Sequence, residues 1–377
     1  MSPTRAAGPP VTWAQTRAFR LARQHLSDPL GPRSLRRVVR NLGGVHAQVA
    51  SAGELQCAVR APGLGVGATN RALWKSKTIV KTWMMRGTLH YLDAEDLPVW
   101  AAASATRQAW RKPAWQKAVG LTIAEIEAAV DAAAEALDGR CLTREALADE
   151  IGKRSKNKTL DEHLRSGWGS ILKIVAAHGL LCFGPNQGRN VTFVRPDQWL
   201  DTWSTPATED AIAEVCRRYL AAHGPATRDE FARWWGFFPP DATKVLDALG
   251  DEVALVDREG DKAFVLQRDL GAVERAEEDA TVRMLGMFDP YTLSGLPHDQ
   301  VVPRAKKDAV YRKGAWVSQV VLRGGRVVGV WSHERTRVGA SVAVTLFVRP
   351  AATKNEIAEA LEPLAVHLGG ISALSVS

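Results

Sequence analysis

The chain has 377 residues, of which 46% are hydrophobic and 24% are charged, close to the globular averages of about 45–50% and about 25%. This composition excludes a disordered or fibrous protein, and the length allows two or three compact units at about 100–200 residues each. The sequence has no uninterrupted apolar stretch of about 18 residues and no secretory signal near its start, which excludes a membrane span and predicts a cytoplasmic protein.

The net charge of +8 is concentrated in two segments. Residues 1–60 contain nine arginines, no lysine and two acidic residues, a net charge of +7, and residues 301–350 carry +8 from ten basic and two acidic residues. The rest of the chain sums to −7. Two basic segments separated by an acidic middle indicate a polyanion-binding surface. Solvated charged faces would give the same pattern, so charge alone leaves both interpretations open.

Helical periodicity over residues 13–26 and 34–42 predicts two amphipathic helices near the start of the chain. Gly43 and Gly44 follow the second helix and predict its end, because glycine readily takes the left-handed conformation that closes a helix C-terminus. A further helix is predicted around residues 65–76.

A histidine and a glutamine follow this helix stop in the segment "VHAQV". In a helix, residues two apart point about 200° apart, whereas on extended backbone they project to the same side. We therefore expect His46 and Gln48 to face the same space, with Ala47 and Val49 packed inward as anchors. The alternative is a pair that only satisfies backbone groups at a helix junction, and for an isolated triplet this is the more common case.

The run "IVKTWMMRGTLHYL" is rich in β-branched and aromatic residues and predicts one or two short strands. Strand alternation would place Arg86, Thr88 and His90 on one polar face. That face either lines a cleft or, as on an ordinary amphipathic strand, meets solvent.

A weak internal repeat relates "CLTREALADEIG" to "PATRDEFARWWG". Thr227 and Glu230 fit a capping box, and Thr143 fits a simpler N-cap. A second amphipathic helix and a strand pair broken by turn residues follow each copy. Helix, turn, helix and hairpin is the order of a winged helix, which we predict at 120–200 and 206–270, with a more divergent third copy as a candidate at the N-terminal end.

From about residue 280 the pattern changes to strands, with a Gly-Gly hairpin signal in "LRGGRVV". Strands are expected within 281–295, 315–334 and 340–348, and a closing helix at 354–369. The segment "FDPY" predicts a strand-end turn, in which Asp289 caps and Tyr291 stacks or donates a hydrogen bond. The predicted fold class is α+β and helix-rich, with several small sheets.

Familiar catalytic motifs are missing from the sequence. There is no phosphate-binding loop, no H-E-x-x-H, no H-x-E paired with C-x-x-C, no G-x-S-x-G and no tight carboxylate cluster. Kinases, metalloproteases, zinc deaminases, α/β-hydrolases and two-metal nucleases therefore have no support. The widely spaced cysteines argue against a disulfide framework and a zinc site, and we expect all of them to be buried, reduced and inert: Cys57, Cys141, Cys182 and Cys216.

Taken in order, the segments "LGGVHAQ", "WMMRGTLH", "GWGSILKIVAAHGLLCFGPNQGR", "RRYLAAHGPATRDEFARWWG", "FDPY" and "VVLRGGRVVGVW" resemble the AlkZ/YcaQ-type DNA glycosylases, a winged-helix superfamily. The resemblance runs from roughly residue 11 to 370, and the combination is specific where no single motif is. That family's catalytic motif is Gln, an apolar residue, then Gln or Asp, after paired glycines. Matching by position puts His46 on the first Gln and Gln48 on the last residue. Histidine at the first place is a departure that resembles a His-apolar-Gln subgroup associated with self-resistance to DNA-alkylating antibiotics.

The resemblance implies three tandem winged-helix domains in a C-shaped body that embraces DNA. On this chain it implies a disordered leader at 1–10, winged-helix domains at 11–118, 119–204 and 205–275, and a C-terminal α+β region at 276–377. It further implies a monomeric, monofunctional DNA glycosylase, associated with the nucleoid, without a cofactor or a metal.

The implied reaction is hydrolysis of the N-glycosidic bond of N7-alkylated purines in double-stranded DNA, including bulky natural-product adducts or interstrand crosslinks. With a usual pKa of about 6.5, histidine is the member of the pair able to accept a proton near neutral pH. We therefore expect His46 to be the base that activates water and Gln48 to position that water. The expected DNA contacts are Arg40, Lys81, Arg86, His90, Arg189, Tyr291 and Arg304.

Two other classes of protein fit parts of the pattern. A non-catalytic winged-helix transcriptional regulator explains the repeats and the charge but gives no role to His46 and Gln48. A scaffold that uses winged helices for protein contacts would have no salt-dependent affinity for DNA.

Overall fold

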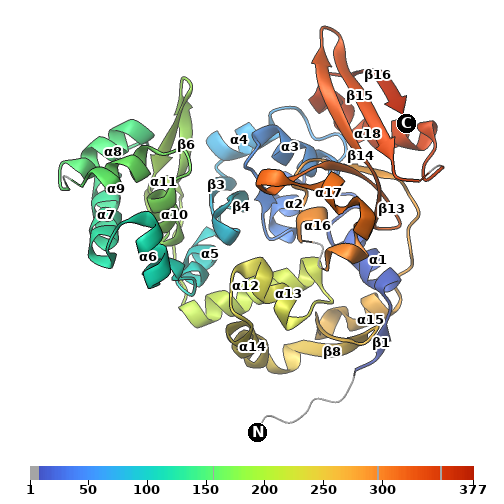
Figure 1. Ribbon diagram of the computed structural model, residues 1–377, viewed down its shortest axis with the longest axis horizontal. Coiled ribbons are helices and arrows are strands. Elements are labelled where there is room, and N and C mark those ends of the chain that lie inside the picture. Colours follow the sequence, from blue (N-terminus) through green and yellow to red (C-terminus); the bar gives the residue numbers. More distant parts are fainter. Residues whose placement is uncertain (1–7, 156, 295–296, 349) are drawn as a thin grey trace. The chain divides into compact units, whose positions relative to one another are not determined.

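The computed structural model describes residues 8–155, 157–294, 297–348 and 350–377, shown as a ribbon in Figure 1. The chain divides into two compact units: one combines the residues up to Thr69 with Cys216–Ser377, and the other contains Asn70–Val215. Both units mix helices with small sheets, so the helix-rich α+β fold class is confirmed. No helix among the described residues is both long and apolar enough to cross a membrane. The three winged-helix domains, their boundaries and the C-shape stay predictions.

Two helices and a glycine turn lead to the His46 segment, and both helices lie where the periodicity predicts them. The elements are β1 (Pro10–Val11), α1 (Trp13–Arg23), α2 (Leu35–Asn41), β2 (Val45–His46) and α3 (Ala50–Ala58). Thr12 begins α1 through a capping box with Gln15. Beyond α2, Gly43 and Gly44 have φ of 66° and 116°, a backbone that favours glycine. The helix stop before His46 is therefore confirmed. The helix predicted around residues 65–76 is also confirmed, as α4 (Ala68–Trp74).

A hairpin lies in the predicted strand region, near the start of the second unit. The hairpin consists of β3 (Ile79–Trp83), a 3₁₀ turn at Met85–Gly87 and β4 (Leu89–Asp93). The strands pair antiparallel, which confirms the two-strand form. The predicted polar strand face of Arg86, Thr88 and His90 is wrong, because Arg86 lies in the turn with a φ of 53° and only His90 lies in a strand. The left-handed backbone at Arg86 interrupts the strand, so side chains on either side of it no longer alternate between two faces.

The rest of the second unit contains the first copy of the predicted helix and hairpin repeat. Its elements are α5 (Leu97–Ser104), α6 (Pro113–Val119), α7 (Ile123–Ala136), β5 (Leu142–Thr143), α8 (Arg144–Gly152), α9 (Lys158–Arg165), α10 (Ser170–Ala177), β6 (Cys182–Gln187), β7 (Asn190–Val194) and α11 (Pro196–Trp199). Thr143 accepts from the Ala146 amide, which confirms the N-cap. The strand order is β5-β7-β6. Helix α9, which Asn157 caps, was not predicted because its sequence is mostly polar.

The second copy of the repeat has the same order without an inserted helix. Its elements are α12 (Thr208–His223), α13 (Arg228–Trp235), α14 (Pro239–Ala248), β8 (Val253–Arg258), β9 (Asp261–Leu266) and α15 (Leu270–Glu274). The capping box of Thr227 and Glu230 is confirmed. Pro10 of β1 pairs in parallel with Asp257 of β8, and residues 1–7 of the predicted leader lie outside the described residues.

A five-stranded sheet dominates the C-terminal region, in the order β10-β13-β14-β15-β16. The elements are β10 (Arg283–Leu285), α16 (Pro290–Ser294), α17 (Lys307–Val310), β11 (Tyr311–Arg312), β12 (Trp316–Val317), β13 (Gln319–Arg323), β14 (Arg326–Thr336), β15 (Gly339–Leu346), α18 (Lys354–Leu368) and β16 (Ile371–Val376). Gly324 and Gly325, with φ of 57° and 71°, make the predicted hairpin turn. Strands were expected within 281–295, and over its described residues, 281–294, the strand is β10, followed by helix α16. Strand β16 was not predicted.

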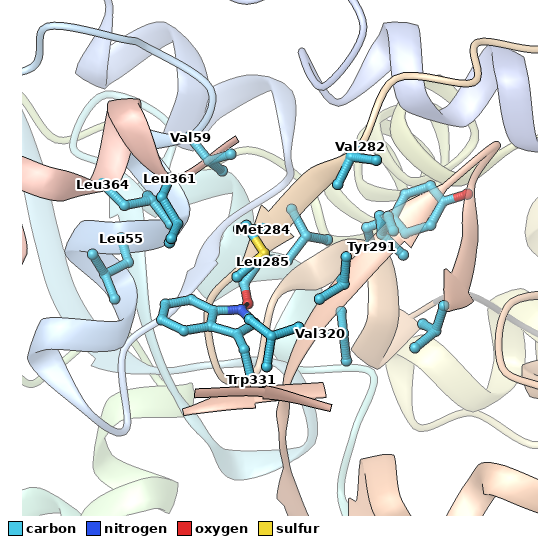
Figure 2. Close-up of a cluster of buried hydrophobic side chains, with 14 of the residues drawn as sticks. Leu55, Val59, Val282, Met284, Leu285, Tyr291, Val320, Trp331, Leu361 and Leu364 are labelled. Atoms are coloured by element: carbon cyan, nitrogen blue, oxygen red, sulfur yellow. Dashed lines mark hydrogen bonds between the residues drawn. The ribbon is translucent and has the colours of Figure 1, made fainter. Parts of the chain in front are cut away.

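The hydrophobic core of the first unit joins α3 to this sheet and to α18 (Figure 2). Leu55 of α3 and Leu361 of α18 are 4% and 2% exposed. The Trp331 indole of β14 fills the space beside them and donates from Nε1 to the Leu285 carbonyl at 2.9 Å. The helix that follows His46 is thereby fixed to the sheet that leads into the FDPY segment.

The cysteines follow the sequence expectation with one exception. Cys57, Cys182 and Cys216 are buried and free of disulfides, and burial raises the pKa of the Cys57 thiol to about 12. Cys141 is exposed, so the prediction of a buried thiol is wrong there; its Sγ donates to Thr192 Oγ1 at 3.1 Å.

Candidate active site

His46 ends the short strand β2, immediately after the glycine turn. Its side chain is buried, at 4% exposed, and Ala47 is fully buried. Gln48 is exposed on the two-residue bend before α3, and Val49 is half-buried. The inward anchors are therefore found at Ala47 and, in part, at Val49. His46 and Gln48 differ in burial. The expectation that their side chains face the same space stays a prediction.

The aromatic ring of Phe288 covers His46. The two ring centroids are 4.6 Å apart, with an angle of 21° between the ring planes, so the rings stack. Phe288 takes a φ of 57°, a left-handed conformation that is unusual for an aromatic residue. Such backbone persists where surrounding contacts fix it and is concentrated at functional sites. Sequence reasoning missed Phe288, because FDPY drew attention to the residues on either side of Pro290.

Gln56 of α3 fastens the two segments to one another. Its Nε2 donates to the His46 carbonyl at 3.2 Å and to the Met287 carbonyl at 2.9 Å. The Gln56 side chain is fully buried, so both hydrogen bonds lie away from water, where an unpaired backbone carbonyl would be unfavourable. One amide group thus holds the backbone beside both stacked rings.

A buried ion pair completes the same connection. Arg60 donates to both Asp289 oxygens at 2.7 and 2.8 Å, and neither side chain is exposed. Arg60 also donates to the carbonyls of Gln24 and Gln56 at 2.9 Å each. Asp289 Oδ1 accepts from the Tyr291 amide at 3.0 Å, which confirms the predicted cap. The position of Phe288 is therefore set by charge-assisted hydrogen bonds on its C-terminal side and by Gln56 on its N-terminal side.

Four of the expected DNA contacts are exposed arginines: Arg40 on α2, Arg86 and Arg189 in hairpin turns, and Arg304 near α17. Their contact with DNA stays a prediction. The other three are placed differently.

Lys81 is half-buried, with Nζ 5.2 Å from the centroid of the Phe183 ring, and burial lowers its pKa. The His90 side chain is buried and its Nδ1 lies 2.9 Å from the Thr88 carbonyl. Tyr291 is 1% exposed and donates its hydroxyl to the Gly325 carbonyl at 2.8 Å. The predicted donation by Tyr291 is confirmed, but its assignment as a DNA contact is wrong, because the ring lies in the core.

Comparison with known proteins identifies the family. A family model described as DNA glycosylase AlkZ-like matches residues 39–366, a range that contains both the His46 segment and the FDPY segment. The match covers most of the chain, which therefore belongs to the AlkZ-like DNA glycosylase family. The resemblance seen in the sequence is confirmed.

Two relatives from Streptomyces sahachiroi agree with this assignment. An interstrand DNA cross-link repair glycosylase is 37% identical over 97% of this chain and 98% of its own length. The solved structure of the DNA glycosylase AlkZ matches with a TM-score of 0.89 and 35% identity, over 98% of this chain and 99% of that chain. The protein is thus a DNA glycosylase, an enzyme that hydrolyses N-glycosyl bonds in DNA repair.

Proposed function

We propose that this glycosylase releases N7-alkylated purines from double-stranded DNA, and that its natural substrates are bulky natural-product adducts or interstrand crosslinks. The cross-link repair activity in the name of the 37% identical relative supports this substrate class. The pathway is repair of alkylation damage or self-resistance to a genotoxin. The enzyme acts as a monomer on nucleoid DNA in the cytoplasm.

The chemistry of an N7-alkylated purine determines what the enzyme has to supply. Alkylation at N7 makes guanine a cation, so the base leaves as a neutral group and needs little help from a general acid. The remaining tasks are to place a water molecule and to stabilise an oxocarbenium-like sugar. An imidazole and a carboxamide are suited to these tasks.

We assign water activation to His46 and water positioning to Gln48. The observation that carries this assignment is the construction around His46: a stacked Phe288 at 4.6 Å and a Gln56 side chain that holds the His46 carbonyl. An imidazole acting as a general base must be held in one orientation, and such help typically contributes about 10²- to 10⁴-fold in rate. Exposed Gln48 is accessible to a substrate from solvent.

A crosslinked purine is joined to both strands and cannot be rotated freely out of the duplex, as a single damaged base can. The proposed enzyme therefore acts on the adduct in an open, basic groove rather than in a closed base pocket. Exposed arginines such as Arg40 and Arg304 contribute phosphate contacts, and affinity falls steeply with salt.

The test is incubation of the purified protein with a duplex that carries one N7-methylguanine. Release of free N7-methylguanine, leaving an abasic site, is the expected result. Shifted but chemically intact DNA would instead support the transcriptional regulator, and the absence of salt-dependent DNA binding would support the scaffold.

A further inference from the structure

A cavity of about 750 Å³ lies in the C-terminal region of the first unit. This volume is within the range of about 300–1,000 Å³ that is typical of small-molecule sites. Its lining combines aromatic, sulfur-containing and charged side chains: Met287, Asp308, Tyr311, Arg312, Lys313 and Trp316. Of these residues, only Met287 also belongs to the site described above, through its backbone carbonyl.

Trp316 is the exposed aromatic residue of this lining, at 47% exposed. The short β11–β12 pairing holds it in place, with Arg312 opposite Trp316. The connecting turn has positive φ at Gly314 and at Ala315, of 73° and 61°. Most tryptophans are largely buried in folded proteins, so a well-positioned indole that faces solvent is a candidate for stacking on a ligand.

The Tyr311 side chain of the lining is held by two contacts. Tyr311 donates its hydroxyl to the Thr292 carbonyl at 3.0 Å, and its ring stacks on His298 with centroids 4.2 Å apart. Burial raises the pKa of the Tyr311 phenol, so the hydroxyl remains a donor. The aromatic lining is therefore formed before any ligand arrives.

A row of rings connects this cavity to His46. Trp316 lies 5.3 Å from Phe288 between ring centroids, and Phe288 lies 4.6 Å from His46. Met287, whose carbonyl Gln56 holds, lines the cavity itself. The Phe288 ring thus lies between the Trp316 indole and the proposed base, in contact with both.

The charges around the cavity fit a substituent attached to DNA. Arg312 and Lys313 are exposed and can contact phosphates on either side of the adduct. The Asp308 carboxylate is also exposed and can accept hydrogen bonds from amine or hydroxyl groups. An aromatic surface between cations and a carboxylate suits a planar, polar-edged ring system better than an alkyl chain.

We infer that this cavity is an adduct subsite: it binds a planar aromatic group carried by the alkylated purine, stacked on Trp316, while the N-glycosidic bond is hydrolysed at His46. The inference rests on the proposed function and names the chemistry of the substituent that the enzyme prefers.

The test compares two duplexes whose adducts differ only in aromaticity, N7-benzylguanine and N7-(cyclohexylmethyl)guanine, together with N7-methylguanine. The wild-type enzyme should release the benzyl adduct faster than the cyclohexylmethyl adduct. In Trp316→Ala and Trp316→Leu this ratio should fall at least about fivefold, because base–aromatic stacking is sensitive to truncation on this scale. Trp316→Phe, which keeps a planar ring, should retain most of the ratio.

Trp168→Ala is the matched control, since Trp168 is a more exposed tryptophan, at 74%, and belongs to the other unit. It should leave the ratio as in the wild type. An unchanged ratio in Trp316→Ala, or full retention in Trp316→Leu, would overturn the subsite while N7-methylguanine release still supports the glycosylase. If the wild-type enzyme releases none of the three bases, the proposed function and the subsite fall together.

Discussion

The two basic segments have almost the same net charge, +7 for residues 1–60 and +8 for residues 301–350. They differ in how far their basic side chains are exposed. In the first segment Arg17, Arg20 and Arg60 are buried, at 8%, 3% and 0% exposed. In the second, basic side chains such as Arg304 and Lys313 are exposed. Equal charge in a sequence therefore does not mean equal charge available to DNA.

The buried arginines act as connectors within the first unit. Arg20 donates to the Pro225 carbonyl at 2.8 Å and lies 3.8 Å from Glu230, and burial lowers its pKa. Arg17 donates to the Gly324 carbonyl at 3.3 Å. Arg60 joins α3 to Asp289. A planar guanidinium with five donors suits such sites, where several carbonyls and a carboxylate need partners. The exposed part of the N-terminal charge is concentrated near α2, at Arg33, Arg37 and Arg40.

The largest expected effect of this difference is on stability. Arg60→Ala would leave the Asp289 carboxylate buried without its partner, and breaking a buried pair in this way costs about 3–5 kcal/mol. The free energy of unfolding in urea should fall by that amount, and release of N7-methylguanine should fall with it because Phe288 loses its support.

Arg140→Ala serves as the comparison, because Arg140 pairs with Glu150 at 3.2 Å on the surface. Its effect should be within about 1 kcal/mol. An Arg60→Ala protein as stable as the wild type would show that the buried arginines are not the connectors described above.

A smaller effect on stability is expected when one exposed arginine from each basic segment is replaced by alanine. Arg40→Ala and Arg304→Ala should leave the free energy of unfolding within about 0.5 kcal/mol of the wild type. Each should reduce the slope of log affinity against log salt by about 0.9, the contribution of one phosphate contact to B-DNA, and the double variant by about twice as much. Binding titrations of an undamaged duplex at several salt concentrations measure this slope. An unchanged slope in both single variants would remove these two residues from the DNA contacts.

The features that could be predicted are those determined by residues close together in the sequence. The N-cap at Thr143, the capping box at Thr227 and the glycine pairs at 43–44 and 324–325 follow from local hydrogen bonding and local backbone preference. The conformation around Arg86 was not predicted, because nothing in a strand-like pattern marks a left-handed arginine.

The site itself was only partly predictable for a related reason. His46 and Gln48 could be selected from the helix stop and the family motif, and Asp289 and Tyr291 from the FDPY turn. The stack of Phe288 on His46 and the hydrogen bond from Gln56 to the Met287 carbonyl each join residues more than 200 positions apart in the sequence. Such pairs depend on tertiary packing, which no local pattern in one sequence contains. Tyr291 was assigned to DNA for the same reason, since a core tyrosine and a surface tyrosine have the same local signature.

The most direct test of the central claim, that His46 activates the attacking water, is the single-turnover release of N7-methylguanine by His46→Ala. His163→Ala is the control, because it removes a histidine outside the proposed site. The Nε2 atom of His163 lies 2.9 Å from a backbone carbonyl. His46→Ala should lower the rate by about 10²- to 10⁴-fold while DNA affinity stays close to that of the wild type, and His163→Ala should release the base normally. Wild-type release by His46→Ala would contradict the claim.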